Sequence, residues 1–154
     1  MRGLVALGAD VNARDAGGST PLHLACTFYP GGPTSLNKTK IARALIRAGA
    51  MPGLRDNEGR TALHLGLMSE SFHISSAVVD ALLEQPGADV NATDVSGKTA
   101  LHLASSAGAA NVRVLLRNAR FRSEVRLDLK SKAGDTALDM ARMEAPDEKL
   151  LRLD

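Results

Sequence analysis

One block of residues recurs along the chain, and this repetition limits the possible folds more than any other feature. Residues 15–25 read Asp-Ala-Gly-Gly-Ser-Thr-Pro-Leu-His-Leu-Ala, and closely similar blocks return at residues 56–66 and 94–104. A less similar fourth copy at residues 131–141 keeps the second Gly, the Thr and the first Leu but begins with Ser131. A unit of this size cannot bury its apolar face alone, so repeated units stack side by side. The sequence therefore predicts a linear stack of similar units.

Each unit has the pattern of a turn followed by two helices. An Asp with a Gly three residues later favours a tight turn, because Gly readily adopts positive φ. The following Thr is a preferred helix N-cap, and Pro21 or an Ala occupies the first helical position. A second apolar segment follows in each complete unit, at residues 41–46, 78–83 and 112–116. We therefore predict an all-α fold of helix-loop-helix units joined by β-turn links.

The segment Thr-Pro-Leu-His-Leu-Ala that starts at Thr20, with related segments at Thr61 and Thr99, resembles the signature of the ankyrin repeat family. The resemblance covers essentially the whole chain. It implies a curved solenoid that binds partner proteins on its concave side, without a cofactor and without catalysis.

We expect a single ankyrin repeat domain over residues 1–154, with incomplete units at its two ends. The leading unit has the end of a second helix and its turn, but no first helix before them. The predicted division is a partial leading repeat at residues 1–18, repeats at 19–58, 59–96 and 97–133, and a shortened terminal repeat at 134–154.

The units are longer than the usual ankyrin unit of about 33 residues. The Thr residues at positions 20, 61, 99 and 136 are separated by 41, 38 and 37 residues. The extra residues fall around 29–37, around 69–75 and in 118–124, and all four aromatic residues lie in or beside these insertions. Because insertions in solenoids often belong to the binding face, we expect Phe28, Tyr29 and Phe72 to anchor a partner. The alternative is that these rings fold back and cover the helix ends beneath the long loops.

The cysteine content and the apolar segments indicate where the protein resides. Its single cysteine, Cys26, excludes an intrachain disulfide and indicates a reducing compartment. No apolar stretch approaches the ~20 residues that a membrane span requires, and residues 4–7 are too short a segment for a signal peptide. We therefore expect an intracellular protein, cytoplasmic or nuclear, without contact to a membrane.

The histidines do not have the pattern of a catalytic or metal site. His23, His64 and His102 occupy the same place in successive units, so they lie one per layer and do not converge. The resemblance implies that each of them bonds turn backbone and ties neighbouring turns together. Cys26 replaces a small packing residue, and His73 has no Cys or carboxylate cluster beside it in the sequence. We therefore predict no catalytic residue, no cofactor and no metal site.

We expect partner contacts at the tips of the turns and late in the first helix of each unit, as the resemblance implies. The candidate residues are Arg14, Phe28, Tyr29, Arg55, Asn57, Glu58, Arg60, Met68, Phe72, Thr93, Val95, Lys98, Lys130 and Lys132. Basic residues outnumber acidic ones in this set, which favours an acidic protein segment as the partner. The neighbouring residues Asp15, Asp56 and Asp94 offset this excess, so the sign of the partner's charge stays open.

The most basic segment of the chain does not have the pattern of a nucleic-acid site. Between Arg113 and Lys132 there are seven basic residues and two acidic ones, with Phe121 as the single aromatic residue. Single-strand binding uses interleaved stacking residues, and base reading uses defined helix motifs, neither of which occurs in this segment. We expect a solvated face or a contact with an acidic protein segment, and not nucleic acid.

The predicted function is a protein–protein interaction module, used as an adaptor or targeting segment of a larger intracellular protein. In a first alternative, the chain is a stand-alone regulator that inhibits an enzyme by occupying its surface. In a second, it is an array appended to a catalytic domain that lies elsewhere in a longer protein. We expect a monomer or a part of a longer chain, and the residues do not specify which partner it binds.

Overall fold

The structure is a computed structural model of the 154-residue chain, and it describes residues 8–27, 35–68, 76–117 and 124–144. These described residues form seven helices and no β-strand. The helices are α2 (Pro21–Cys26), α3 (Ser35–Arg47), α4 (Ala62–Leu67), α5 (Ser76–Leu83), α6 (Ala100–Ala107), α7 (Ala109–Leu116) and α9 (Ala137–Glu144).

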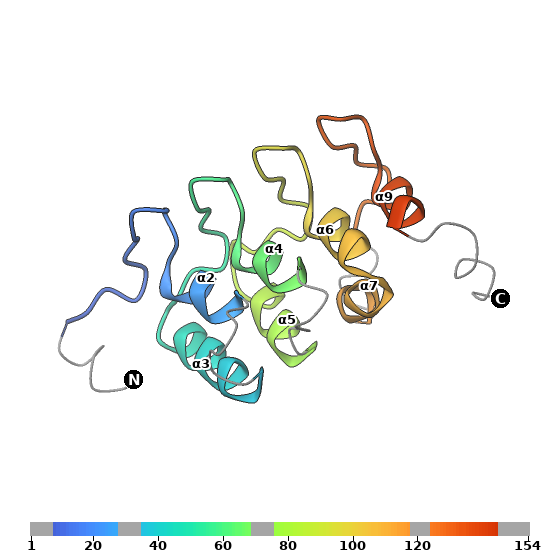
Figure 1. Cartoon of the computed structure of the whole chain (residues 1–154). Coiled ribbons are helices and arrows are strands. Elements are labelled where there is room, and N and C mark those ends of the chain that lie inside the picture. The colour runs from blue at the N-terminus through green and yellow to red at the C-terminus, as the bar shows by residue number, and fades with distance from the viewer. Residues whose placement is uncertain (1–7, 28–34, 69–75, 118–123, 145–154) are drawn as a thin grey trace.

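The helices form two rows, and each row follows the order of the chain (Figure 1). Helices α2, α4, α6 and α9 form an inner row next to four projecting loops. Helices α3, α5 and α7 form an outer row, on the side of the inner row that faces away from the loops. Helix α2 packs against α3 and α4, while α6 packs against α4, α7 and α9. The outer helices contact one another in the same order, α3 with α5 and α5 with α7. The predicted all-α stack of helix-loop-helix units is confirmed.

Each inner helix begins directly after the Thr that the sequence marks as its cap. The amides of Thr20, Thr61 and Thr99 donate to Nδ1 of the His three residues later, at 3.2, 3.1 and 3.1 Å. At α9 the His is replaced by Asp139, whose carboxylate accepts from the Thr136 amide at 3.0 Å. The side chain three residues into each helix thus pairs a backbone donor at the helix start. The repeated Thr therefore sets the start of every inner helix.

The core between the two rows is built from aliphatic side chains. Leu22, Leu67, Leu82 and Leu115 are fully buried, and Ala, Val and Ile side chains pack among them. The four aromatic residues of the chain all lie outside the described ranges. Small and branched aliphatic side chains let the paired helices approach closely and leave few voids.

One buried polar side chain links two units inside the core. Asn111 of α7 is fully buried, and its Nδ2 group donates to the carbonyl oxygen of Leu67 at 3.1 Å. Leu67 is the last residue of α4, so its carbonyl is among those that a helix C-terminus leaves unpaired. Asn111 therefore pairs a backbone acceptor whose burial without a partner would be costly.

The start of helix α3 differs from the sequence prediction. We predicted an insertion around residues 29–37, but α3 already begins at Ser35, so the last three of these residues are helical. Pro33 is the last proline of the segment, and no residue after it prevents a helix. Of the other predicted insertion residues, 29–34, 69–75 and 118–123 lie outside the described ranges, and the unit boundaries stay a prediction.

A glycine lies where one turn meets the next. Gly59 has φ +73°, and a Cβ atom there would lie 3.0 Å from the amide nitrogen of Val95 in the following turn. Gly97 has the same φ, and its Cβ atom would lie 3.0 Å from the amide nitrogen of Lys132. A side chain at either position would be strained by the backbone conformation and crowded by the next turn. Glycine is therefore required both by conformation and by contact.

Asparagine side chains bridge the bases of the turns at two of the described junctions. Asn12 accepts from the Met51 amide at 2.9 Å and donates to the Gly49 carbonyl at 3.2 Å. Asn91 makes the corresponding bonds with residues 124–126, at 2.7 and 2.8 Å. These two side chains therefore join one unit to the next.

The middle junction has a glycine where the other two have asparagine. Gly53 takes the place equivalent to Asn12 and Asn91, and a Cβ atom there would lie 2.3 Å from the carbonyl oxygen of Gly87. The two backbones approach so closely that no side chain fits between them. At this junction the two backbones therefore lie close together, whereas an asparagine side chain bridges each of the other two.

We predict that Gly53→Ala destabilises the array by ~1–3 kcal/mol, because the added methyl group must displace the Gly87 backbone. Urea unfolding followed by circular dichroism measures the free energy of unfolding. The matched control is Gly17→Ala, where the Cβ atom would meet a flexible carboxylate oxygen of Asp15 at 3.3 Å, and we expect a smaller loss. Equal losses in the two variants would contradict the close approach at Gly53.

Candidate partner-binding surface

Four turns at the ends of the projecting loops form a row along one side of the stack (Figure 1). We name them tip 1 (residues 14–19), tip 2 (residues 55–60), tip 3 (residues 93–98) and tip 4 (residues 130–135). One backbone hydrogen bond of 2.8–2.9 Å joins each tip to the preceding one, donated by Asn57, Val95 and Lys132. The four tips therefore form one continuous surface.

The three repeated histidines connect this row to the inner helices. Nε2 of His23, His64 and His102 donates to a carbonyl oxygen of the next tip, at 3.0, 3.2 and 3.2 Å. Nδ1 of each ring accepts from the Thr amide at the start of its own helix. Both ring nitrogens are used, and the neutral tautomer with its proton on Nε2 satisfies both bonds. These histidines are structural ties between units, as the resemblance to ankyrin repeats implied.

Three of the predicted contact residues bond other tips of the row. Arg14 donates to the Arg55 carbonyl at 2.5 Å, and Arg55 donates to the Thr93 carbonyl at 2.5 Å. The side-chain amide of Asn57 donates to the Ala16 carbonyl at 3.0 Å. Each of these side chains crosses from one tip to a neighbour. They therefore stabilise the row, and part of their hydrogen-bonding capacity is already occupied.

Arg60 pairs with two carboxylates of its own tip. Its Nε lies 2.8 Å from Asp56 Oδ2, and its Nη1 lies 2.8 Å from Glu58 Oε2. Burial of Asp56 opposes its ionisation, but hydrogen bonds from Arg60 outweigh burial and hold the pKa of Asp56 below its usual value. The positive charge of Arg60 is therefore neutralised within tip 2, and Glu58 belongs to the same group.

The other predicted tip residues lie in tips 3 and 4 and are open to solvent. Thr93, Val95, Lys130 and Lys132 are exposed, and Lys98 is half-buried. In the part of the chain that the structure describes, none of the three lysine ammonium groups forms a salt bridge. Tips 3 and 4 therefore carry three ammonium groups without a salt bridge among the described residues, whereas the guanidinium groups of Arg14 and Arg55 donate to carbonyl oxygens of neighbouring tips.

The remaining candidates are Met68 and three aromatic residues. Met68 follows the last residue of α4 and is 44% exposed, so a large flexible apolar side chain is accessible at the end of that inner helix. Phe28, Tyr29 and Phe72 lie outside the described residues. Their role as anchors stays a prediction.

Ser131 is a residue that we did not predict at this surface. In tips 1–3 the equivalent residue is an Asp whose carboxylate accepts from two amides of its own turn. Ser131 is 6% exposed, and its hydroxyl has no hydrogen-bond partner among the described residues. The replacement is visible when the four copies are aligned, but its effect on the backbone amides is visible only in the folded turn.

The one cysteine of the chain lies inside the hydrophobic core. Cys26 is buried in α2, and burial raises the pKa of its thiol to about 12. The thiol is therefore protonated at neutral pH and is not a nucleophile. Among the described residues, no three His, Cys, Asp or Glu side chains lie together as metal ligands would.

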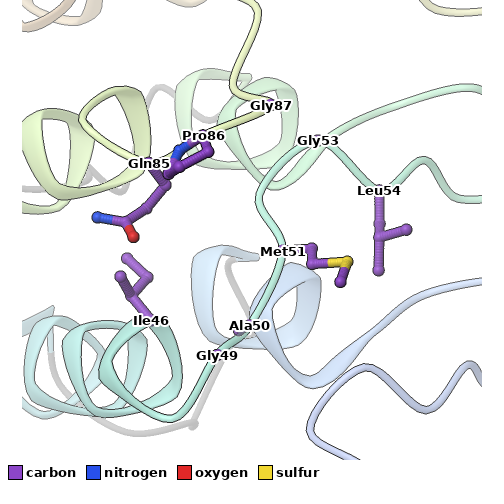
Figure 2. Close-up of a pocket in the computed structure, with 9 residues that line it drawn as sticks. All are labelled: Ile46, Gly49, Ala50, Met51, Gly53, Leu54, Gln85, Pro86 and Gly87. Atoms are coloured by element: carbon purple, nitrogen blue, oxygen red, sulfur yellow. The ribbon is translucent and has the colours of Figure 1, made fainter.

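A pocket of about 490 Å³ opens at the middle junction, where Gly53 replaces the bridging asparagine (Figure 2). Its walls come from the end of α3 at Ile46, from residues 49–54 and from residues 85–87. These walls are backbone, apolar side chains and the amide of Gln85, and none of the lining residues is titratable. The pocket therefore has room for a small apolar group but no charged feature that would select a ligand.

Paired helices stacked in rows, with a bonded row of turns at one edge, define a helical repeat solenoid. The family model described as ankyrin repeats (3 copies) matches residues 1–94 and 67–148. The chain belongs to the ankyrin repeat family. Ankyrin repeats generally act as protein-interaction modules.

Similar proteins are considerably longer than this chain. Rabankyrin-5 of Mus musculus is 39% identical over 105 residues, which is 66% of this chain and 9% of that protein. Ankyrin repeat domain-containing protein 63 of Mus musculus is 34% identical over 131 residues, which is 85% of this chain and 31% of that protein. The chain therefore spans less than a third of the length of these two relatives.

The helices of the described residues are short. Over the ranges that the structure describes, none of them has both the length and the apolar character that crossing a membrane requires.

We predict that acidification destabilises the array through the histidine ties. Burial lowers the pKa of His23 and His64 below the usual 6.5, although the tip carbonyl that each ring contacts raises it. The folded rings therefore bind protons less readily than the unfolded ones, so stability is full above pH 6.5 and falls below it. Urea unfolding at pH 7.5 and pH 5.5 measures the difference.

The variant His64→Gln separates this effect from general acid sensitivity. At pH 7.5 it should lose ~1–3 kcal/mol, because the Lys98 carbonyl and the Thr61 amide lose their shared partner. Its further loss between pH 7.5 and 5.5 should be smaller than in the unchanged chain. An undiminished loss would show that His64 does not carry the pH dependence.

Proposed function

We propose that this chain is a protein-interaction module that binds a partner along the row of tips and at the adjoining ends of the inner helices. One observation carries the proposal. The tips are tied to one another by backbone hydrogen bonds and to the helices by histidines, while Thr93, Val95, Lys130 and Lys132 of tips 3 and 4 are exposed. A surface ordered in advance loses little conformational freedom on binding, which favours affinity.

Within this proposal, the predicted contact residues have two roles. Arg14, Arg55 and Asn57 hold the row together and contact the partner with their exposed parts. The residues of tips 3 and 4 and Met68 contact the partner directly. The aromatic residues Phe28, Tyr29 and Phe72 are proposed as further anchors. Glu58 and Arg60 contribute a salt bridge at tip 2, in which Arg60 also pairs with Asp56.

We also propose that the chain serves as an adaptor or targeting segment of a larger intracellular protein. The lengths of the two relatives support this, since the matched region is a minor part of each. A single cysteine, buried and protonated, is consistent with a reducing compartment.

The position of the contact can be tested with a photo-crosslinking amino acid. We predict that benzoylphenylalanine at Val95 of tip 3 crosslinks a partner in extracts of the native cells, because this side chain is 53% exposed on the tip row. The matched control places the same group at Ala77, which is exposed on the outer helix α5. Mass spectrometry identifies the products, and excess unlabelled chain must compete with them. Equal crosslinking at both positions, or crosslinking at Ala77 alone, would overturn the proposed surface.

A further inference from the structure

All four tips share the same backbone turn. The amide of the first turn residue donates to the carbonyl four positions later, at 2.9–3.0 Å in every tip. The amide of the tip glycine donates back to the carbonyl of the first turn residue, also at 2.9–3.0 Å. The amides inside the turn therefore occupy equivalent positions in all four tips.

In tips 1–3 an internal carboxylate completes this turn. Oδ1 of Asp15, Asp56 and Asp94 accepts from the amides two and four residues later, at 2.8–2.9 Å in every case. A single carboxylate oxygen thus satisfies two convergent N–H groups. In three copies of the turn, these amides therefore bind a carboxylate oxygen.

Tip 4 has the same turn without the carboxylate. Ser131 replaces the Asp, and the amides of Ala133 and Asp135 have no acceptor among the described residues. The Ser131 hydroxyl is also unpaired, and the residue is more than nine-tenths buried. Among the described residues, three hydrogen-bonding groups of one turn thus have no protein partner at the place where the other tips hold a carboxylate oxygen.

The charges around tip 4 favour an anion. Lys130 and Lys132 flank Ser131, and both are exposed without a salt bridge within the described residues. A Cβ atom built on Gly97 would lie 3.4 Å from Cγ of Lys132, so the Lys132 side chain lies against tip 3, next to Lys98. Three ammonium groups are thus carried by tips 3 and 4.

The acidic residues near tip 4 do not take the place of the missing carboxylate. Asp128 pairs with Arg126, at 3.1 and 2.6 Å. Asp139 accepts from the amide and the hydroxyl of Thr136, at 3.0 and 2.6 Å. Asp135 is half-buried, and its carboxylate forms no hydrogen bond with the turn among the described residues. The amides therefore remain unpaired although carboxylates are present nearby.

We propose that tip 4 binds a carboxylate side chain of the partner protein, in the position that the internal Asp occupies in tips 1–3. One oxygen accepts from the amides of Ala133 and Asp135, and Lys130 and Lys132 contact this carboxylate and acidic residues beside it. This inference rests on the proposed function, since it names the chemistry of the partner at the same surface. The partner segment is an acidic stretch of Asp or Glu.

A carboxylate fits this turn better than other anions for a geometric reason. The same backbone turn binds a carboxylate in three other copies, so the spacing of the two amides already suits one carboxylate oxygen. The lysines add attraction that falls with salt, while the amides supply direction. Binding should therefore require the unfilled turn and not the positive charge alone.

The test uses the 154-residue chain labelled with ¹⁵N, and hexa-aspartate as the probe. We expect the amide signals of Ala133 and Asp135 to shift downfield and to saturate as the peptide is added, with smaller changes in tips 1 and 2. Hexa-lysine should leave them unchanged. Inorganic phosphate and hexa-phosphoserine are the competing anions, and stronger saturable shifts with either of them than with hexa-aspartate would overturn the assignment to a carboxylate.

Two substitutions at one position separate the unfilled turn from the charge. Ser131→Asn supplies a neutral oxygen that can accept from both amides, as the Asp residues do in the other tips. Ser131→Asp supplies the internal carboxylate itself. Both should raise the thermal midpoint by a few degrees and abolish the saturable shifts. If Ser131→Asn binds hexa-aspartate as the unchanged chain does, general charge attraction explains the binding and the proposal fails.

A paired charge control completes the design. Lys130→Gln with Lys132→Gln should weaken hexa-aspartate binding by about fivefold or more. Lys40→Gln with Arg43→Gln removes the same charge from exposed positions of the outer helix α3, and should change binding less than twofold. If both double variants weaken hexa-aspartate binding equally, the net charge of the chain explains the binding and the proposal fails. If Val95 crosslinks a partner while the tip 4 amides do not respond, this inference fails and the proposed function stands.

Discussion

The hydrogen bond from each repeated histidine to the next tip is the interaction on which the rest of the structure depends. Nε2 of the ring donates across the junction, and Nδ1 accepts from the Thr amide that begins its own helix. One neutral ring thus fixes a helix start, a turn and the spacing between two units. Because the rings are buried, losing one leaves backbone groups without partners in a place that water does not readily reach. The row of tips is ordered before any partner arrives for this reason.

Each junction between tips has this histidine hydrogen bond, but the junctions differ in which other side chains bond across them. Between tips 1 and 2, Arg14, Asn12 and Asn57 all add hydrogen bonds across the junction. Between tips 2 and 3, Arg55 adds one, while Gly53 brings the backbones into direct contact. Side-chain bonding within the row is thus densest at its N-terminal end. The unpaired lysines and the unfilled turn lie at the other end, where hydrogen-bonding capacity is left for a partner.

The tips differ in whether an internal carboxylate pairs the amides of the turn. In tips 1–3 the internal Asp pairs the turn amides, and tip 2 also neutralises its own arginine. Such a turn is stable by itself and presents few unmet groups. Tip 4 keeps the same backbone with Ser131 in place of Asp, so it gives up internal bonds. A turn that is incomplete alone and complete with a partner gains stability on binding, which links the energetics of the fold to its function.

The sequence by itself determined the repeated unit and the helix starts at Thr20, Thr61, Thr99 and Thr136, because these depend on residues close together in the chain or repeated in register. The tie role of the histidines was implied by the resemblance to the ankyrin repeat family. The same resemblance identified the tips as the candidate contact surface. The sequence could not determine which tip side chains form hydrogen bonds with other tips, because Arg14 and Arg55 donate to carbonyl oxygens about forty residues away in the next unit. The start of α3 at Ser35 was likewise misplaced, since loop composition sets helix ends loosely. Only the tertiary structure decided that Gly53 is required by the Gly87 backbone and that Ser131 leaves two amides unpaired, because both facts depend on distances between backbone groups.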